Sequence, residues 1–164
     1  VNIASIEKIL LQISDKQKNN NVVAVGTTSL RTIESLYWMG VKTNLNSDYS
    51  LPELEIKQWD AFELPQNIHT KDSLKSLLAW LKKNEMEKLL CKTQILIVPD
   101  YKLRIANALV TNFHQPCSTL LLLIAAVVGD DWKKIYKYAL ENNFRFLSYG
   151  DGSLIFKNNI ENEN

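Results

Sequence analysis

The chain has 164 residues, and its 19 Lys and Arg residues against 18 Asp and Glu residues give a formal net charge of +1, so no overall positive charge points to a nucleic-acid partner. Its apolar content of 46% is enough to form the core of one globular domain. Cys91 and Cys117 lie far apart and form no CxxC pair or metal-ligand spacing with His69 or His114. We therefore expect a reduced cytoplasmic protein without a metal site.

The ends and the longest apolar stretch of the chain give further expectations. Residues 120–128 are too few to cross a bilayer, which takes about 20 apolar residues, and the N-terminus lacks a signal-peptide pattern. The chain opens at Val1 and runs almost at once into a helical pattern. We expect a soluble protein without a membrane partner, and a fragment of a longer chain.

The first predicted elements are a helix, a strand and a second helix. Apolar residues at helical spacing predict a helix over residues 3–18. Residues 22–25 form a short apolar, β-branched run that is typical of a strand buried on both faces. Helical spacing returns over residues 30–40, where Gly40 stands in the position of a C-terminal cap.

The middle of the chain is less regular. Pro, Asn and Ser residues interrupt residues 41–69, which predicts a variable, loop-rich excursion. An amphipathic helix is predicted over residues 71–88. The apolar runs 93–98 and 105–110 are separated by a turn-rich link, so we expect two adjacent strands in a hairpin.

The last third is predicted to contain two helices and a turn. Residues 120–128 are apolar all round, which indicates a buried helix that ends at Gly129. A surface helix is expected over residues 131–142, followed by a polar turn at 148–152 between two apolar segments. We expect residues 158–164 to be a disordered tail.

The alternation of strands and helices predicts an α/β fold over residues 1–157 as a single domain. Because the expected hairpin excludes a purely parallel sheet, we predict a mixed sheet with helices on both faces.

A polar turn follows the first predicted strand. Gly26 precedes the hydroxyl residues Thr27, Thr28 and Ser29, and Arg31 adds a positive charge. Free backbone N–H groups and the helix dipole at this point favour an anion such as a carboxylate or phosphate. Ordinary capping of the helix by the hydroxyls is the alternative, and no GxGxxG or P-loop pattern is present.

His114 is the best candidate for an acid or base. It follows a predicted strand and precedes a proline-containing turn, a place where α/β sheets commonly meet ligands, and imidazole titrates near neutrality. Asn112 beside it could orient a polar ligand. The alternative is a histidine with a structural role only.

The turn at residues 148–152 offers a phenol at Tyr149, a carboxylate at Asp151 and two glycines that allow close backbone approach. These groups suit a turn that faces a ligand. A plain hairpin turn is the alternative.

Three segments taken together resemble one enzyme family in order and spacing: residues 23–35 (VAVGTTSLRTIES), 108–114 (ALVTNFH) and 144–151 (FRFLSYGD). The chain is similar there to the S-adenosylmethionine:tRNA ribosyltransferase-isomerases of queuosine synthesis. The resemblance implies the C-terminal part of an α/β domain, without the β-barrel domain that is inserted in this family.

The resemblance also implies an activity. The enzyme would transfer and isomerise the ribosyl group of S-adenosylmethionine, as co-substrate, onto 7-aminomethyl-7-deazaguanine in tRNA, giving epoxyqueuosine and releasing adenine and methionine. The proposed route deprotonates the carbon next to the sulfonium before the amine of the base attacks, and His114 fits the role of base. We expect this fragment alone to be inactive.

The implied site residues are catalytic or ligand-binding groups of these segments. They are His114 and Asp151 as catalytic residues, and Thr27, Thr28, Ser29, Arg31, Thr111, Asn112, Phe113, Ser118, Thr119, Ser148, Tyr149 and Gly150 as cofactor- or substrate-binding residues.

The sequence also departs from the family pattern. Asp100 stands where the family usually has glycine, Asn107 where it has aspartate and Gln115 where it has leucine. Loss of the carboxylate at Asn107 would weaken activity, so two alternatives stay open. One is a noncatalytic paralogue that binds RNA or a nucleotide, and the other is a nucleotide-dependent transferase acting on a small molecule.

Overall fold

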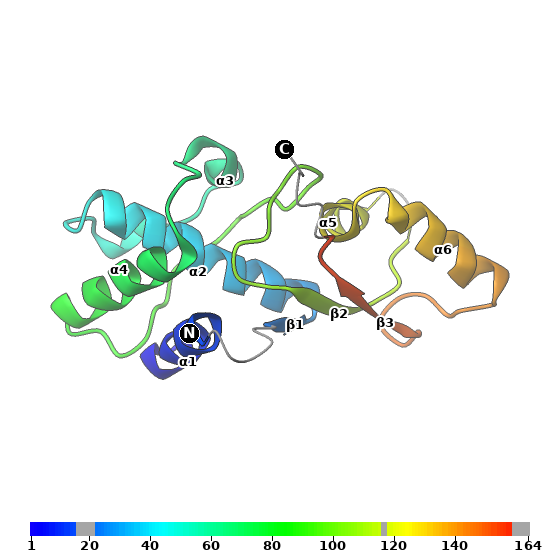
Figure 1. Cartoon of the computed structure of the whole chain (residues 1–164), viewed down its shortest axis with the longest axis horizontal. Helices are drawn as coiled ribbons and strands as arrows, with labels where there is room; N and C mark the ends of the chain where they lie inside the picture. The colour runs from blue at the N-terminus through cyan, green and yellow to red at the C-terminus, as the bar shows by residue number, and fades with distance from the viewer. Residues whose placement is uncertain (16–21, 116–117, 159–164) are drawn as a thin grey trace.

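The computed structural model of the chain describes residues 1–15, 22–115 and 118–158. The molecule is elongated, with α1, α2 and α4 toward one end, α5 and α6 toward the other, and a small sheet between them (Figure 1). The elements in chain order are α1 (Ile3–Ser14), β1 (Val23–Val25), α2 (Thr27–Leu45), the 3-10 helix η1 (Leu51–Leu54), α3 (Asp60–Glu63), α4 (Thr70–Lys83), β2 (Ala108–Asn112), α5 (Thr119–Val128), α6 (Asp131–Glu141) and β3 (Gly152–Phe156).

The sheet has the order β1-β2-β3, with β1 parallel to β2 and β3 antiparallel to it. Ala24 lies opposite Leu109, and Leu109 lies opposite Ile155, so the three side chains share one face. All three are buried, and α2 and α5 contact the strands. The mixed α/β class expected from the sequence is confirmed.

The other face of the sheet is exposed along β1 and β3 among the described residues, while Ala108 of β2 on the same face is buried. Val23 and Val25 of β1 and Leu154 and Phe156 of β3 are exposed on it. The expectation that β1 is buried on both faces was therefore wrong, because its three residues alternate between exposed and buried. Helices cover the Leu109 face, and the second layer expected from the sequence is not formed by the described part of the chain.

Helix α2 does not end at Gly40 as the sequence suggested but continues to Leu45. Gly40 is an interior position where α2 crosses α4, and a Cβ there would collide with the backbone carbonyl of Ser73. Tyr37 and Trp38 are fully buried beside it. The glycine therefore serves close helix packing and not termination.

The expected hairpin of residues 93–98 and 105–110 was wrong. Thr93 makes only an isolated bridge to Ile56, and β2 begins at Ala108 and pairs with β1 and β3 instead. The N–H groups of residues 104–106 are bound to the side chain of Glu34. They are therefore unavailable for a strand ladder.

The remaining predicted helices are present with shifted ends. Helix α1 ends at Ser14, and residues 16–18 of its prediction lie outside the described residues. Helix α4 ends at Lys83, five residues earlier than Lys88. Helix α5 ends at Gly129, which has the positive φ of 61° expected of a glycine cap.

At the C-terminal end, the backbone N–H of Asn158 donates to the carbonyl of Val127 at 2.9 Å. The rest of the predicted tail lies outside the described residues. Among the described helices, none has the length and apolarity to span a membrane.

Candidate functional site at the carboxyl ends of the strands

Three chain segments meet where β1 and β2 end and β3 begins. The N–H of Gly26 donates to the carbonyl of Val110 at 2.8 Å, which brings the start of α2 beside β2. Asn112 pairs with Gly152 in the sheet register. The three segments that carry the family resemblance are therefore neighbours at one edge of the sheet.

The start of α2 is uncapped. Its N-cap is Gly26, with φ 89°, and no side chain caps the helix. The alternative drawn from the sequence was capping by the hydroxyls of Thr27, Thr28 and Ser29, and it was wrong, because all three lie inside the helix. The first N–H groups of a helix have no acceptor within it, so they and the helix dipole are available to an anion here.

Two predicted site residues hold buried polar atoms without a hydrogen-bond partner among the described residues, namely Nε of Arg31 and Oγ of Ser118. Buried polar atoms in native proteins are rarely left unsatisfied. Arg31 lies in the second turn of α2, four residues after its first residue Thr27.

His114 is held by two hydrogen bonds. Its Nε2 lies 3.0 Å from Oγ1 of Thr111, and its backbone N–H donates to the phenol oxygen of Tyr136 at 3.1 Å. Partial burial lowers the pKa of the imidazole below its ordinary value of 6.5. The ring is therefore neutral at physiological pH, the state that a proton acceptor needs.

Phe113 lies inside the molecule rather than on the open site. Its ring is buried and packs edge to face with Tyr136 and Phe144, with centroids 5.5 Å apart in each case. Its carbonyl accepts a hydrogen bond from the N–H of Leu147 at 2.9 Å. Phe113 thus anchors the segment that carries His114 to the turn that follows α6.

The turn that ends at Asp151 is held by its own hydrogen bonds. Asp151 Oδ2 accepts from the backbone N–H of Arg145 at 2.7 Å, and the Asn112 amide donates to the carbonyl of Gly150 at 3.2 Å. The backbone N–H of Arg145, and secondly its guanidinium, donate hydrogen bonds to the Asp151 carboxylate. These two bonds lower the pKa of the Asp151 carboxyl. A Cβ at Gly150 would collide with the Arg145 backbone, so only glycine fits.

The other predicted residues of this turn are open to solvent. Ser148 is exposed, and Tyr149 has 98% of its surface exposed. Ser118 and Thr119 belong to a different hollow, a cavity of about 420 Å³ that they line with Pro99 and Trp132. The site is therefore an exposed edge, with Ser118 and Thr119 lining a cavity of their own.

Asn107 lies at the opposite end of β2, beyond its first residue. Its Oδ1 accepts a hydrogen bond from the N–H of Val22 at 3.0 Å. An amide oxygen can accept this bond in place of a carboxylate oxygen, without the added strength of a charge. The departure from aspartate at this position therefore removes no charge from the edge that carries His114.

Two basic surfaces differ in their charge balance. On α6, Lys133 and Lys134 form ion pairs with Asp130 and Asp131 at 3.5 and 2.7 Å. Elsewhere, a cavity of about 510 Å³ near the start of α4 is lined by four basic side chains. They are Lys71, Lys75, Arg104 and Lys157, beside one acidic side chain, Asp72. The three lysines have no ion pair with a described residue.

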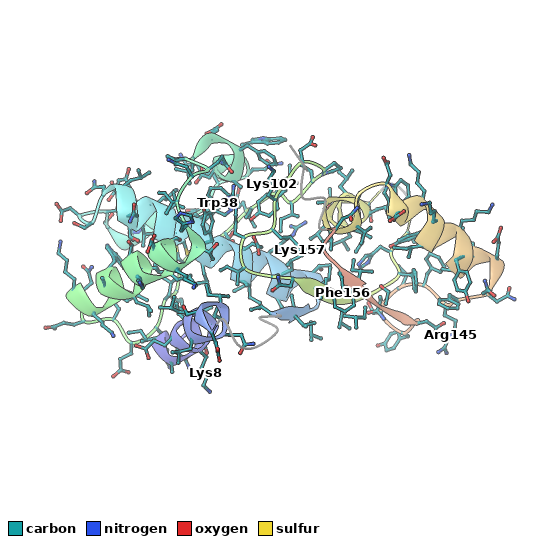
Figure 2. All side chains as sticks on the ribbon, viewed as in Figure 1. Lys8, Trp38, Lys102, Arg145, Phe156 and Lys157 are labelled. Carbon is teal, nitrogen blue, oxygen red and sulfur yellow. The ribbon has the colours of Figure 1, made fainter. Side chains whose placement is uncertain are left out.

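Tyr136 and Arg145 are positioning residues whose contacts the sequence motifs did not indicate, although Arg145 lies within the family segment 144–151. Tyr136 accepts the hydrogen bond that holds the backbone of His114, and Arg145, near the α6 end of the molecule (Figure 2), holds Asp151. Tyr136 lies in α6, and Arg145 lies in the segment between α6 and β3. No local signal connects either to His114.

Comparison with known proteins agrees with this geometry. The model of the family described as queuosine biosynthesis protein matches residues 4–155. The chain belongs to this family. It is 34% identical, over 87% of its length, to an S-adenosylmethionine:tRNA ribosyltransferase-isomerase of Rickettsia bellii, of which it covers 28%. A Thermotoga maritima protein of the same name is 31% identical over 85% of the chain, which covers 29% of that protein.

A solved structure supports the same assignment. The crystal structure of an S-adenosylmethionine tRNA ribosyltransferase from Thermotoga maritima matches with a TM-score of 0.56 and 29% sequence identity. The match covers 92% of this chain and 39% of that chain. Queuosine-family membership was expected from the three segments and is confirmed, while the chain spans under a third of the length of these two curated relatives.

Proposed function

We propose that the protein acts in the ribosyltransferase-isomerase reaction of queuosine synthesis, with S-adenosylmethionine as ribosyl donor and tRNA carrying 7-aminomethyl-7-deazaguanine as acceptor. The observation that carries the proposal is the meeting of the three family segments at one sheet edge, with a neutral His114 among them. The relatives' names state the donor and the tRNA substrate for those proteins. A cytoplasmic location accords with a tRNA substrate.

The site residues fit the charges of this donor. The uncapped start of α2, with Gly26 as N-cap, suits a carboxylate or phosphate, and Arg31 adds a positive charge nearby. Asn112 and Asp151 stiffen the neighbouring turn through their bonds to Gly150 and Arg145. On this proposal Tyr149 and Ser148, which are exposed, contact the ribose or the modified base.

His114 serves as the base in this proposal. When Nε2–H donates to Oγ1 of Thr111, the lone pair resides on Nδ1 and can accept a proton from the carbon next to the sulfonium. Thr111 is then a positioning residue that orients the ring. Because burial lowers the pKa of the ring, the lone pair is free at neutral pH.

The activity is tested with the complete gene product that carries this sequence, since the chain covers only part of its relatives. Incubation with precursor tRNA and S-adenosylmethionine is expected to release adenine and to give modified tRNA. His114→Ala is expected to lower kcat about 10²–10⁴-fold, the range of general base catalysis. No adenine release by the wild type would refute the activity, and undiminished turnover by His114→Ala would refute the base.

For the tRNA, we propose that phosphate groups contact the basic cavity near the start of α4. Its lysines lack ion pairs with described residues, whereas those of α6 are paired. Lys71→Glu with Lys75→Glu is expected to weaken tRNA binding and to reduce its salt dependence. Lys133→Glu with Lys134→Glu, the matched control, is expected to have a smaller effect, and an equal effect would contradict the assignment.

A further inference from the structure

Leu147 has a backbone conformation that is unusual for its side chain. Its φ is 70°, in the left-handed region that disfavours bulky residues. The other non-glycine residues with positive φ in the described chain are Glu85, Asp100 and Asn143. Glu85 and Asn143 each follow the last residue of a helix by two positions, and Asp100 is of a type that tolerates this region. Leu147 ends no helix and is not of such a type.

Hydrogen bonds of the surrounding backbone impose this conformation on Leu147. Its N–H donates to the carbonyl of Phe113 at 2.9 Å, and its carbonyl accepts from the N–H of Gly150 at 2.9 Å. The N–H of Asp151 donates to the carbonyl of Arg145 at 2.8 Å, which closes the turn. Together these bonds over-determine the backbone, so the turn holds the strained residue in place.

The strain at Leu147 is not repaid by burial of its side chain. The preceding residue, Phe146, packs on Phe113 and Tyr136 with ring centroids 5.6 and 6.0 Å apart, and it anchors the turn. Leu147 lies outside the core cluster, and 49% of its surface is exposed. Backbone strain that persists without a gain in packing is found mostly where a protein meets its ligands.

Leu147 lies beside the proposed base. The carbonyl that accepts its N–H belongs to the peptide bond between Phe113 and His114. Tyr149, with 98% of its surface exposed, follows in the same turn, and Arg145, which begins the turn, lies near the α6 end of the molecule (Figure 2). A rigid turn next to His114 therefore presents one aliphatic and one aromatic side chain to an incoming substrate.

These two side chains suit a base within an RNA chain. Bases in RNA stack on their neighbours, and an enzyme that does chemistry on a base takes it out of the stack. Proteins insert apolar side chains such as leucine between neighbouring bases, and aromatic side chains stack on bases that have left the stack. Leu147 has the chemistry of the first group, and Tyr149 has that of the second.

We propose that Leu147 is a wedge that enters the base stack of the tRNA beside the acceptor base and keeps that base turned out towards His114. The inference rests on the proposed function, because it takes a tRNA base as the acceptor. The over-determined backbone keeps Leu147 in place, so that the RNA and not the turn yields where the two meet. The ring of Tyr149 then stacks on the base that has been turned out.

The direct test is fluorescence of the complete gene product with two synthetic stem-loop RNAs. Both carry 7-aminomethyl-7-deazaguanine, with 2-aminopurine, which brightens when it loses stacking, on its 3′ side in one and on its 5′ side in the other. Binding of the wild type without S-adenosylmethionine is expected to raise the fluorescence of at least one RNA several-fold. Leu147→Ala is expected to bind the RNA without this rise, and Leu147→Met is expected to restore it.

The matched control is Leu140→Ala, which truncates another exposed leucine, with 67% of its surface exposed, and should give the wild-type rise. An equal rise with Leu147→Ala, or no rise with a bound wild type, would overturn the wedge. If the wild type is active and Leu147→Ala turns over tRNA equally fast, the wedge alone fails. A wild type that neither binds nor modifies tRNA would refute the proposed function and the wedge together.

Turnover and stability give an independent check. Leu147→Ala is expected to lower kcat/KM for tRNA about ten-fold or more, because the cost of unstacking is no longer offset. Leu147→Gly should lose turnover in the same way but keep its unfolding midpoint, because glycine adopts positive φ freely. A midpoint lowered by several degrees would show that Leu147 packs inside the complete protein, and it would overturn the proposal.

Discussion

Two polar clusters in this molecule are built in opposite ways. The carboxylate of Glu34 is fully buried and accepts four hydrogen bonds, from the Tyr101 hydroxyl and from the N–H groups of residues 104–106. Around His114, the start of α2 is uncapped and Tyr149 is almost fully exposed. A satisfied buried cluster fixes a fold, whereas polar groups kept open at a sheet edge are available to a ligand.

The largest effect is expected at the first cluster. Glu34→Ala leaves three N–H groups, two of them buried, and the Tyr101 hydroxyl without their acceptor, so we expect a loss of about 3–5 kcal/mol in unfolding free energy. Urea denaturation measures it. Glu7→Ala, which removes an exposed ion pair with Lys82, is the control and should cost under about 1 kcal/mol. Similar losses for Glu34→Ala and Glu7→Ala would contradict the structural role of the Glu34 cluster.

A smaller loss of unfolding free energy is expected when one hydroxyl is removed from the same cluster. The Tyr101 hydroxyl accepts from Trp38 Nε1 at 2.9 Å and donates to Glu34 Oε2 at 2.8 Å. Burial, and secondly the charge of Glu34, raise the pKa of Tyr101 well above its ordinary value, so the hydroxyl keeps its proton. Tyr101→Phe should cost about 1–3 kcal/mol by urea denaturation, and a neutral effect would mean that water replaces the hydroxyl.

At the second cluster, stability and activity should separate. His114→Ala removes a half-buried ring with one side-chain hydrogen bond, so we expect less than about 1.5 kcal/mol of lost stability. The same variant is expected to lose most of its turnover. Thermal or urea unfolding of the variant checks the first part, and a loss comparable with that of Glu34→Ala would place His114 among the structural residues.

The smallest effect is a pH dependence. Burial lowers the pKa of folded His114 below 6.5, so protonation favours the unfolded chain. The stabilising contribution of the neutral ring is present above the unfolded value and is lost as pH falls through 6.5 toward the folded value. The unfolding free energy of the wild type minus that of His114→Gln should be constant above neutrality and should fall on acidification. A rise of this difference on acidification would mean that the pKa of folded His114 is raised and not lowered.

Local patterns predicted the parts of this molecule that depend on neighbours in sequence. The strand β1, the helix α2 that follows Gly26 and the buried helix α5 all follow from short stretches, although their ends are shifted. Family membership depended on three such stretches. The functional roles of the remaining candidate residues, such as Tyr149, stay predictions.

The errors arose where distant residues decide. Glu34 reads as one polar position of a helix, and nothing near residues 104–106 indicates that their N–H groups are bound to it. Gly40 reads as a helix end, although its role is set by Ser73 on another helix. The exposure of Val23 and Val25 likewise depends on what covers the sheet and not on their own β-branched character.

The Glu34 cluster also orders events as the chain folds. Its partners follow it by 67 to 72 residues, so a long loop must close before any of the four hydrogen bonds can form. Until then the carboxylate must keep its hydration, and the side of α2 that carries Glu34 cannot pack against the rest of the core. During synthesis, α2 therefore waits for residues 101–106 to leave the ribosome before it can reach its final packing.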